Sequence, residues 1–117
     1  YNLVFVCSGA ADVGAVADQA ARQLSRDKTA SMCCTAAIAA KIPDILEKTT
    51  SAAASVVIDG CDQACAKEIM DAGGFSGYAY IELGALGMEK GKSPVDDARI
   101  TQAADAATRA LRAVTGA

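Results

Sequence analysis

The sequence predicts an α/β fold: a small, Rossmann-like three-layer α/β/α sandwich built around a mostly parallel four-stranded sheet. Short apolar runs typical of buried strands alternate with amphipathic stretches typical of helices. The hydrophobic fraction is 52%, much of it alanine, while aromatic residues make up only 4%, which favours closely packed helices against a small sheet. With 117 residues the chain is long enough for one real core, so residues 1–117 are predicted to form a single domain.

The first half of the chain begins with a strand and continues with helices. Leu3–Val6 is an apolar run that ends at Cys7-Ser8-Gly9, and a helix follows it. The apolar face of that helix is formed by Val13, Val16, Ala17, Ala20 and Leu24. Residues 29–33 fit a short strand, and residues 35–42 fit a short helix that stops before Pro43. Pro43 then suits the first turn of another helix, which is expected to run to about residue 53.

The second half repeats the alternation of strand and helix. Val56–Ile58 is a β-branched run, and Asp59-Gly60 is a turn whose aspartate can cap the next helix. That helix is predicted to open at Cys61 and to end at Gly73-Gly74, with Cys61, Cys65, Ile69 and Ala72 on one face. Residues 77–83 predict a fourth strand, and residues 84–92 a loop. Its Lys90 and Lys92 are most simply expected in solvent, with a role over the site as the less favoured alternative. Ser93-Pro94 is predicted to open the last helix as its cap and first residue.

The spacing of Cys61 and Cys65 favours a shared metal ion over a disulfide. On one helix their Cβ atoms would lie about 5–6 Å apart. A disulfide needs about 3.8 Å between Cβ atoms. Two sulfurs that each lie about 2.3 Å from one metal ion tolerate the wider gap.

Thiols also follow three of the predicted strands. A cysteine lies between a predicted strand and the helix after it at three places: Cys7, the Cys33-Cys34 pair and Cys61. Because the carboxyl ends of parallel strands share one edge of the sheet, we expect these thiols at that edge, with Cys65 one helical turn further along. Together they predict a closed, tetrahedral four-sulfur zinc site formed by Cys7, one of Cys33 and Cys34, Cys61 and Cys65.

Composition excludes several classes of function. The chain has five cysteines and no histidine, so Ser-His-Asp and Cys-His catalysis are excluded, and a transition-metal site must use cysteine, with aspartate or glutamate as the remaining choices. The odd cysteine count and the absence of a secretion signal argue against a disulfide framework and predict a reducing, cytoplasmic location. The net charge is −3 and no basic cluster is present, so no nucleic-acid partner is expected. No apolar run approaches the length that spans a membrane, so no membrane partner is expected either. The turn at Cys7 also lacks the Walker and dinucleotide-binding motifs.

These residues resemble a known family, the DGC-domain proteins. Ile58-Asp59-Gly60-Cys61, followed by Cys65, resembles the motif that gives the family its name. Cys7-Ser8-Gly9 and the segment from Met32 to Ile38 resemble two further cysteine segments, so the resemblance covers most of the chain. It implies a zinc-binding protein with four chelating cysteines, here Cys7, Cys34, Cys61 and Cys65, with Cys33 as an additional thiol. It implies no particular activity.

Other uses of the same thiols stay open at this point. A closed four-thiolate site leaves no position for water, so zinc hydrolysis is not predicted, and the ion could be structural, delivered or sensed. Cys7 and Cys61 could instead carry redox or sulfur-transfer chemistry, because thiolates are favoured near helix N-termini. An iron–sulfur cluster would use the same four thiolates. Nothing in the sequence identifies a protein partner.

Overall fold

The computed structural model describes residues 1–116 and confirms the predicted three-layer α/β architecture. Its four strands are all parallel and stand in the order β2-β1-β3-β4. They are β1 (Asn2–Val6), β2 (Ser31–Met32), β3 (Ala54–Asp59) and β4 (Ala79–Glu82). The helices are α1 (Asp12–Arg26), α2 (Thr35–Ala39), α3 (Pro43–Ser51), α4 (Cys65–Ala72) and α5 (Asp97–Thr115), with the short 3-10 helix η1 (Leu83–Leu86) after β4.

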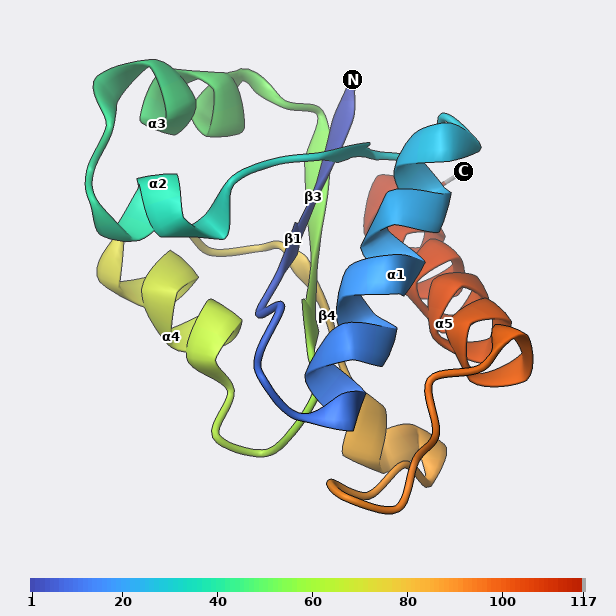
Figure 1. Cartoon of the computed structure of the whole chain (residues 1–117). Coiled ribbons are helices and arrows are strands. Elements are labelled where there is room, and N and C mark those ends of the chain that lie inside the picture. Colours follow the sequence, from blue (N-terminus) through green and yellow to red (C-terminus); the bar gives the residue numbers. More distant parts are fainter. Residues whose placement is uncertain (117) are drawn as a thin grey trace.

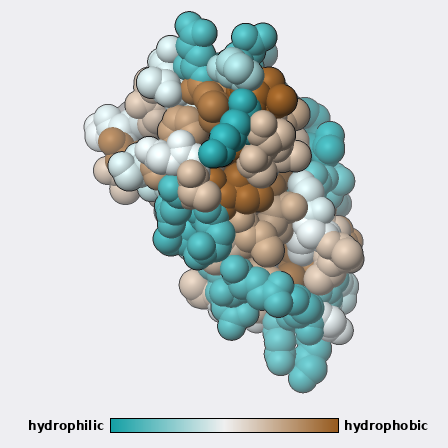
Figure 2. Space-filling model, turned by 90° about the vertical axis from the view of Figure 1, so that its left-hand side faces the viewer, coloured by the Kyte–Doolittle hydropathy of each residue, from teal (hydrophilic) through white to brown (hydrophobic). Residues whose placement is uncertain are grey.

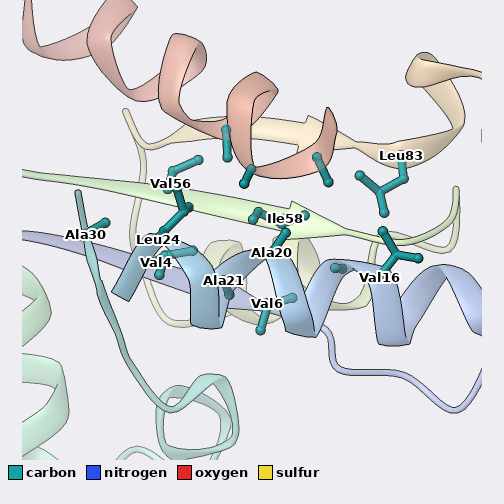
Figure 3. Packing of buried hydrophobic residues seen from close by; sticks show 14 of the residues in the cluster. Val4, Val6, Val16, Ala20, Ala21, Leu24, Ala30, Val56, Ile58 and Leu83 are labelled. Carbon is teal, nitrogen blue, oxygen red and sulfur yellow. The ribbon is translucent and has the colours of Figure 1, made fainter. Parts of the chain in front are cut away.

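The larger core lies between the sheet and the pair of helices α1 and α5, which cover the same face (Figure 1). Val4, Val6, Val56 and Ile58, at alternate positions of β1 and β3, point into it. Figure 3 shows them opposite Val16, Ala20, Ala21 and Leu24 of α1. The small alanine side chains allow α1 to lie close to the strands, as the alanine-rich composition predicted.

The other face of the sheet carries α2, α3 and α4 (Figure 1). Leu3, Phe5 and Val57 point to this side and pack against Ile38 of α2 and Met70 of α4. Several apolar side chains at its margin are only partly buried: Ile45, Leu46, Ile69 and Phe75. Figure 2 views this side of the molecule and shows apolar atoms at the surface between hydrophilic groups. This face is therefore covered less completely than the α1–α5 face.

The start of α4 differs from the prediction. The helix begins at Cys65 rather than Cys61, and residues 61–64 form a turn that ends with Ala64 in the left-handed conformation (φ 54°, ψ 44°). The cause is Asp59, whose carboxylate accepts hydrogen bonds from the backbone N–H groups of Ala66 and Lys67 and so fixes the first turn of the helix. Cys61 and Cys65 are therefore not neighbours on one helical face, and the spacing argument built on that face was wrong.

The start of α5 also differs from the prediction that Ser93-Pro94 opens it. The helix begins at Asp97, after Asp96, whose side chain accepts a hydrogen bond from the Arg99 N–H at 2.9 Å. Ser93 is buried and its hydroxyl bonds to the backbone of Glu89, so it closes the preceding loop instead. Two cap-forming residues compete here, and Asp96 stands at the offset that reaches an unpaired helix N–H.

The remaining boundaries agree with the sequence within a few residues. Helix α4 ends at Ala72, just before Gly73 and the left-handed Gly74, as the glycine pair predicted. Strand β2 is limited to Ser31–Met32, and α2 stops at Ala39. Across residues 1–116, no helix combines the length and the apolar character that crossing a bilayer requires.

Candidate functional site

The candidate site lies where neighbouring strands send the chain to opposite faces of the sheet. After β1 the chain continues into α1 on one face, whereas after the adjacent β3 it continues into α4 on the other. Such a divergence leaves a crevice beyond the carboxyl ends of the strands. Figure 1 shows the loops after β1 and β3 at the same end of the molecule as the loop that precedes α5. A pocket of about 400 Å³ opens there.

Three thiols line this pocket: Cys7, Cys61 and Cys65. Cys7 follows β1 directly and is half-buried; its Sγ accepts a hydrogen bond from the Gly60 N–H at 3.4 Å, and its own N–H donates to the Ile58 carbonyl at 3.2 Å. Cys61 lies in the turn after β3 and is half-buried, while Cys65 is exposed at the first position of α4. The topology thus brings together thiols that stand more than fifty positions apart in the sequence.

The other two cysteines do not line the pocket. Cys33 is 8% exposed and belongs to the core on the α2–α4 face. Cys34 is exposed and precedes the first residue of α2. The neighbouring Thr35 fastens this segment to β1, because its hydroxyl donates to the Val6 carbonyl at 2.9 Å and accepts from the Val6 N–H at 3.1 Å.

Asp59, the first residue of the Asp-Gly-Cys motif, has a structural role. It is 1% exposed, and its carboxylate accepts three hydrogen bonds: from Ala66 N–H at 2.9 Å, Lys67 N–H at 3.0 Å and the Tyr80 hydroxyl at 3.0 Å. Burial and the bond to this carboxylate raise the pKa of Tyr80 above its ordinary value. Asp59 therefore positions the start of α4, and with it Cys65, and ties both to β4.

Gly60, the second residue of the motif, is required by the close approach of α1. A Cβ atom added at Gly60 would lie 2.7 Å from the Val13 carbonyl carbon and 2.8 Å from the Gly14 nitrogen. Gly14 is equally crowded, since its Cβ would lie 2.5 Å from the Gly9 carbonyl oxygen. The backbone at Gly60 therefore packs directly against the backbone at the start of α1, and no side chain fits between these two segments.

Lys90 reaches the pocket from a loop distant in the sequence. Asp12, the first residue of α1, accepts hydrogen bonds from the Gly91 N–H at 2.9 Å and the Ser93 N–H at 3.0 Å. These backbone hydrogen bonds lower the pKa of Asp12. They hold the loop before α5 against the start of α1, and Lys90, next to Gly91, lines the pocket. Lys90 is exposed, as the sequence predicted, and it also borders the pocket, which was the less favoured alternative; the hydrogen bonds from Asp12 had no local signal in the sequence.

The donor chemistry suits a soft metal ion, but the four predicted sulfur ligands do not converge in this conformation. All five cysteines are free thiols. Among residues 1–116, no three cysteine, aspartate or glutamate side chains are placed to hold one metal ion. Cys7, Cys61 and Cys65 share a pocket without forming a ready coordination shell, and Cys34 stands outside its lining. A metal could be held by these residues only after side chains or the turn at 61–64 move.

Comparison with known proteins identifies the family. The family model described as the DGC domain matches residues 3–107. A curated relative, the anaerobic and virulence modulator AnvM of Pseudomonas aeruginosa, is 32% identical over 65 residues, which is 56% of this chain. The match spans 50% of that relative's length. No solved structure matches the chain. Since the family model covers nearly the whole chain, including every cysteine described above, this protein belongs to the DGC-domain family.

Proposed function

We propose that this protein binds one zinc ion through thiolates at the pocket between β1 and β3. The observation that carries the proposal is that Cys7, Cys61 and Cys65, which follow the ends of two adjacent strands, line one pocket. With no histidine in the chain, thiolate is the soft ligand it offers, and zinc is commonly bound by such sulfur-rich sets. Cys34, the fourth ligand predicted from the sequence, would have to move with its segment to join them.

The turn at residues 61–64 is the part of the pocket that can adapt to an ion. Its last residue, Ala64, is held in the left-handed region, which costs a non-glycine residue about 1–2 kcal/mol. The opposite wall is fixed by the backbone packing of Gly60 against α1. Zinc binding would therefore be accompanied by a change in this turn, with the wall at α1 left in place.

The test is metal analysis of protein purified without added metal, with reactive thiols counted before and after chelation. We expect about one zinc per chain and an increase in reactive thiols when the metal is removed. Cys65→Ser should lose most of the bound zinc; Cys65 is exposed, so the change should leave the fold intact. The control is Cys33→Ser, which changes a thiol outside the pocket and should keep the bound zinc.

Three results would contradict the proposal. A Cys65→Ser protein with undiminished zinc would show that the metal is held elsewhere. Protein that is purified without metal and does not take up added zinc would favour redox or sulfur-transfer chemistry as the role of the pocket thiols. A brown colour with bound iron would replace zinc by an iron–sulfur cluster on the same thiolates.

A further inference from the structure

A second pocket lies at the opposite end of the sheet from the three thiols. It opens beside the amino end of β3, between α3 and residues 73–78, which join α4 to β4. Figure 1 shows α3 and the start of β3 at one end of the molecule and the loops after β1 and β3 at the other. The volume of this amino-end pocket is about 380 Å³, within the range of small-molecule sites, about 300–1,000 Å³.

The hydroxyl of Ser55 lacks a protein partner and lines the amino-end pocket. Ser55 is 8% exposed and alternates along β3 with Val56, so it points to the α2–α4 face, as Val57 does. Among residues 1–116 its hydroxyl makes no hydrogen bond. Since no fully enclosed polar side-chain atom in this range lacks a partner, the Ser55 oxygen keeps its access through the pocket. A hydroxyl this deeply placed normally has a partner, and the pocket has room for one.

Two other hydroxyls of the lining are set to accept hydrogen bonds. The Thr49 hydroxyl donates to the Ile45 carbonyl at 2.7 Å, and the Thr50 hydroxyl donates to the Leu46 carbonyl at 3.0 Å. Each hydroxyl has one hydrogen and two lone pairs, so both threonines have used their donor and keep lone pairs. A molecule that bonds to them must therefore bring its own O–H or N–H donors.

The rest of the lining favours a neutral molecule with an apolar face. None of the described residues that line the amino-end pocket is charged, so a charged ligand would lose hydration without gaining an opposite charge. Met70, Phe75 and Tyr78 add apolar surface to the lining. The Tyr78 hydroxyl already donates to Asp71, which leaves its ring as the part that can pack against a ligand.

We infer that the amino-end pocket binds a neutral, hydroxyl-rich ring compound of the size of a monosaccharide. Its hydroxyls donate to Thr49 and Thr50, and one of them bonds to Ser55. Its C–H face packs against Phe75 and Tyr78. Binding is non-covalent, and Ser55 acts as a specificity residue for the ligand hydroxyl. The inference is independent of the proposed zinc site, because the two pockets share no lining residue.

The experiment is a titration of ¹⁵N-labelled protein followed by NMR, with glucose, galactose and mannose as neutral probes. We expect at least one of these hexoses to shift the amide signals of Ser55, Gly74 and Gly77 in a saturable way, with a Kd of about 1–10 mM. The amides of Cys7 and Cys61, at the other pocket, should not move. Glucuronate and glucosamine, which are charged sugars of similar size, should bind about fivefold more weakly than the best neutral hexose.

Two serine variants separate a binding role from a structural one. Ser55→Ala should weaken hexose binding about fivefold, the effect of one net hydrogen bond. Its melting temperature should equal or exceed that of the wild type, because the hydroxyl that is removed has no protein partner. Ser51→Ala makes the same chemical change at an exposed residue of α3 outside the lining, and should leave binding unchanged.

Several results would overturn the inference. One is the absence of saturable shifts at Ser55, Gly74 and Gly77 with all three hexoses up to about 50 mM. Charged sugars that bind as tightly as neutral ones, or undiminished binding in Ser55→Ala, would also overturn it. A clearly lower melting temperature of Ser55→Ala would show that the hydroxyl serves the fold instead. None of these results bears on the thiols, so the proposed zinc site would stand or fall by its own test.

Discussion

Replacing Asp59 by alanine should destabilise the whole domain, although the residue lies beside the candidate site. Its carboxylate is 1% exposed and accepts hydrogen bonds from Ala66, Lys67 and Tyr80. Each such bond contributes about 1 kcal/mol net. Losing all three should therefore lower the free energy of unfolding by about 3 kcal/mol, a large share of the roughly 5–15 kcal/mol typical of a domain.

The assay is urea unfolding of Asp59→Ala followed by far-UV circular dichroism, with thermal unfolding as a second measure. At about 4 °C per kcal/mol for a chain of this size, the melting temperature should fall by about 12 °C. Tyr80→Phe removes one of the three bonds and should cost about 1 kcal/mol. In the Tyr80→Phe background, Asp59→Ala should cost correspondingly less than it does alone.

Local measurements test the geometric part of the reasoning. The amide protons of Ala66 and Lys67 should exchange faster with solvent in Asp59→Ala, because their acceptor is gone. The amides of β1, whose pairing with β3 does not involve Asp59, serve as the internal reference. An Asp59→Ala protein within about 0.5 kcal/mol of the wild type would refute the assigned role, since that is the range of an ordinary surface substitution.

Three further predictions follow from the same region. Gly60→Ala should cost about 1–3 kcal/mol in the free energy of unfolding, because its Cβ would meet the α1 backbone; wild-type stability in urea would contradict this. Burial and the bond to Asp59 raise the pKa of Tyr80 above its ordinary 10.0, so its contribution to stability is complete below pH 10.0 and is lost as the pH rises above it; urea midpoints from about pH 8 to 11 should fall more steeply in wild type than in Tyr80→Phe. Thr35→Val keeps the side-chain shape but frees both backbone groups of Val6, and should cost about 1–3 kcal/mol by the same urea assay, while no measurable loss would rule out those two bonds.

Much of the fold could be predicted from the sequence because its signals are local. Apolar runs such as Leu3–Val6 and Val56–Ile58 became the central strands, and the glycine pair at 73–74 ended α4. The starts of α4 and α5 were less predictable, and at α5 two cap-forming residues, Ser93 and Asp96, competed. Asp59 was expected to cap the helix after β3, but no periodicity reveals that the N–H group it bonds belongs to Ala66, seven positions further on.

The site was predictable to the level of the sheet edge. Cys7 and Cys61 follow adjacent parallel strands, so their meeting at one pocket follows from topology. The position of Cys34 was not predictable in this way, because β2 is only two residues long and its chain turns away toward α2. The position of Lys90 at the pocket was only the less favoured alternative, because Asp12 holds its loop across some eighty positions of sequence.

The backbone contact between Gly60 and α1 also limits how this pocket can diversify. The wall formed by Gly60 and the start of α1 carries no side chain at the point of contact. A substitution there would disturb the backbone packing before it altered the chemical groups of the pocket. The opposite wall, residues 61–64, and residues 89–92 of the loop that bears Lys90 are exposed or half-buried, so their replacement should leave the sheet intact. A designer who wished to adapt this pocket to a chosen ligand would therefore keep the glycines and randomise residues 61–64 and the exposed positions around Lys90. The architecture separates a stable half from an adjustable half within a single binding site.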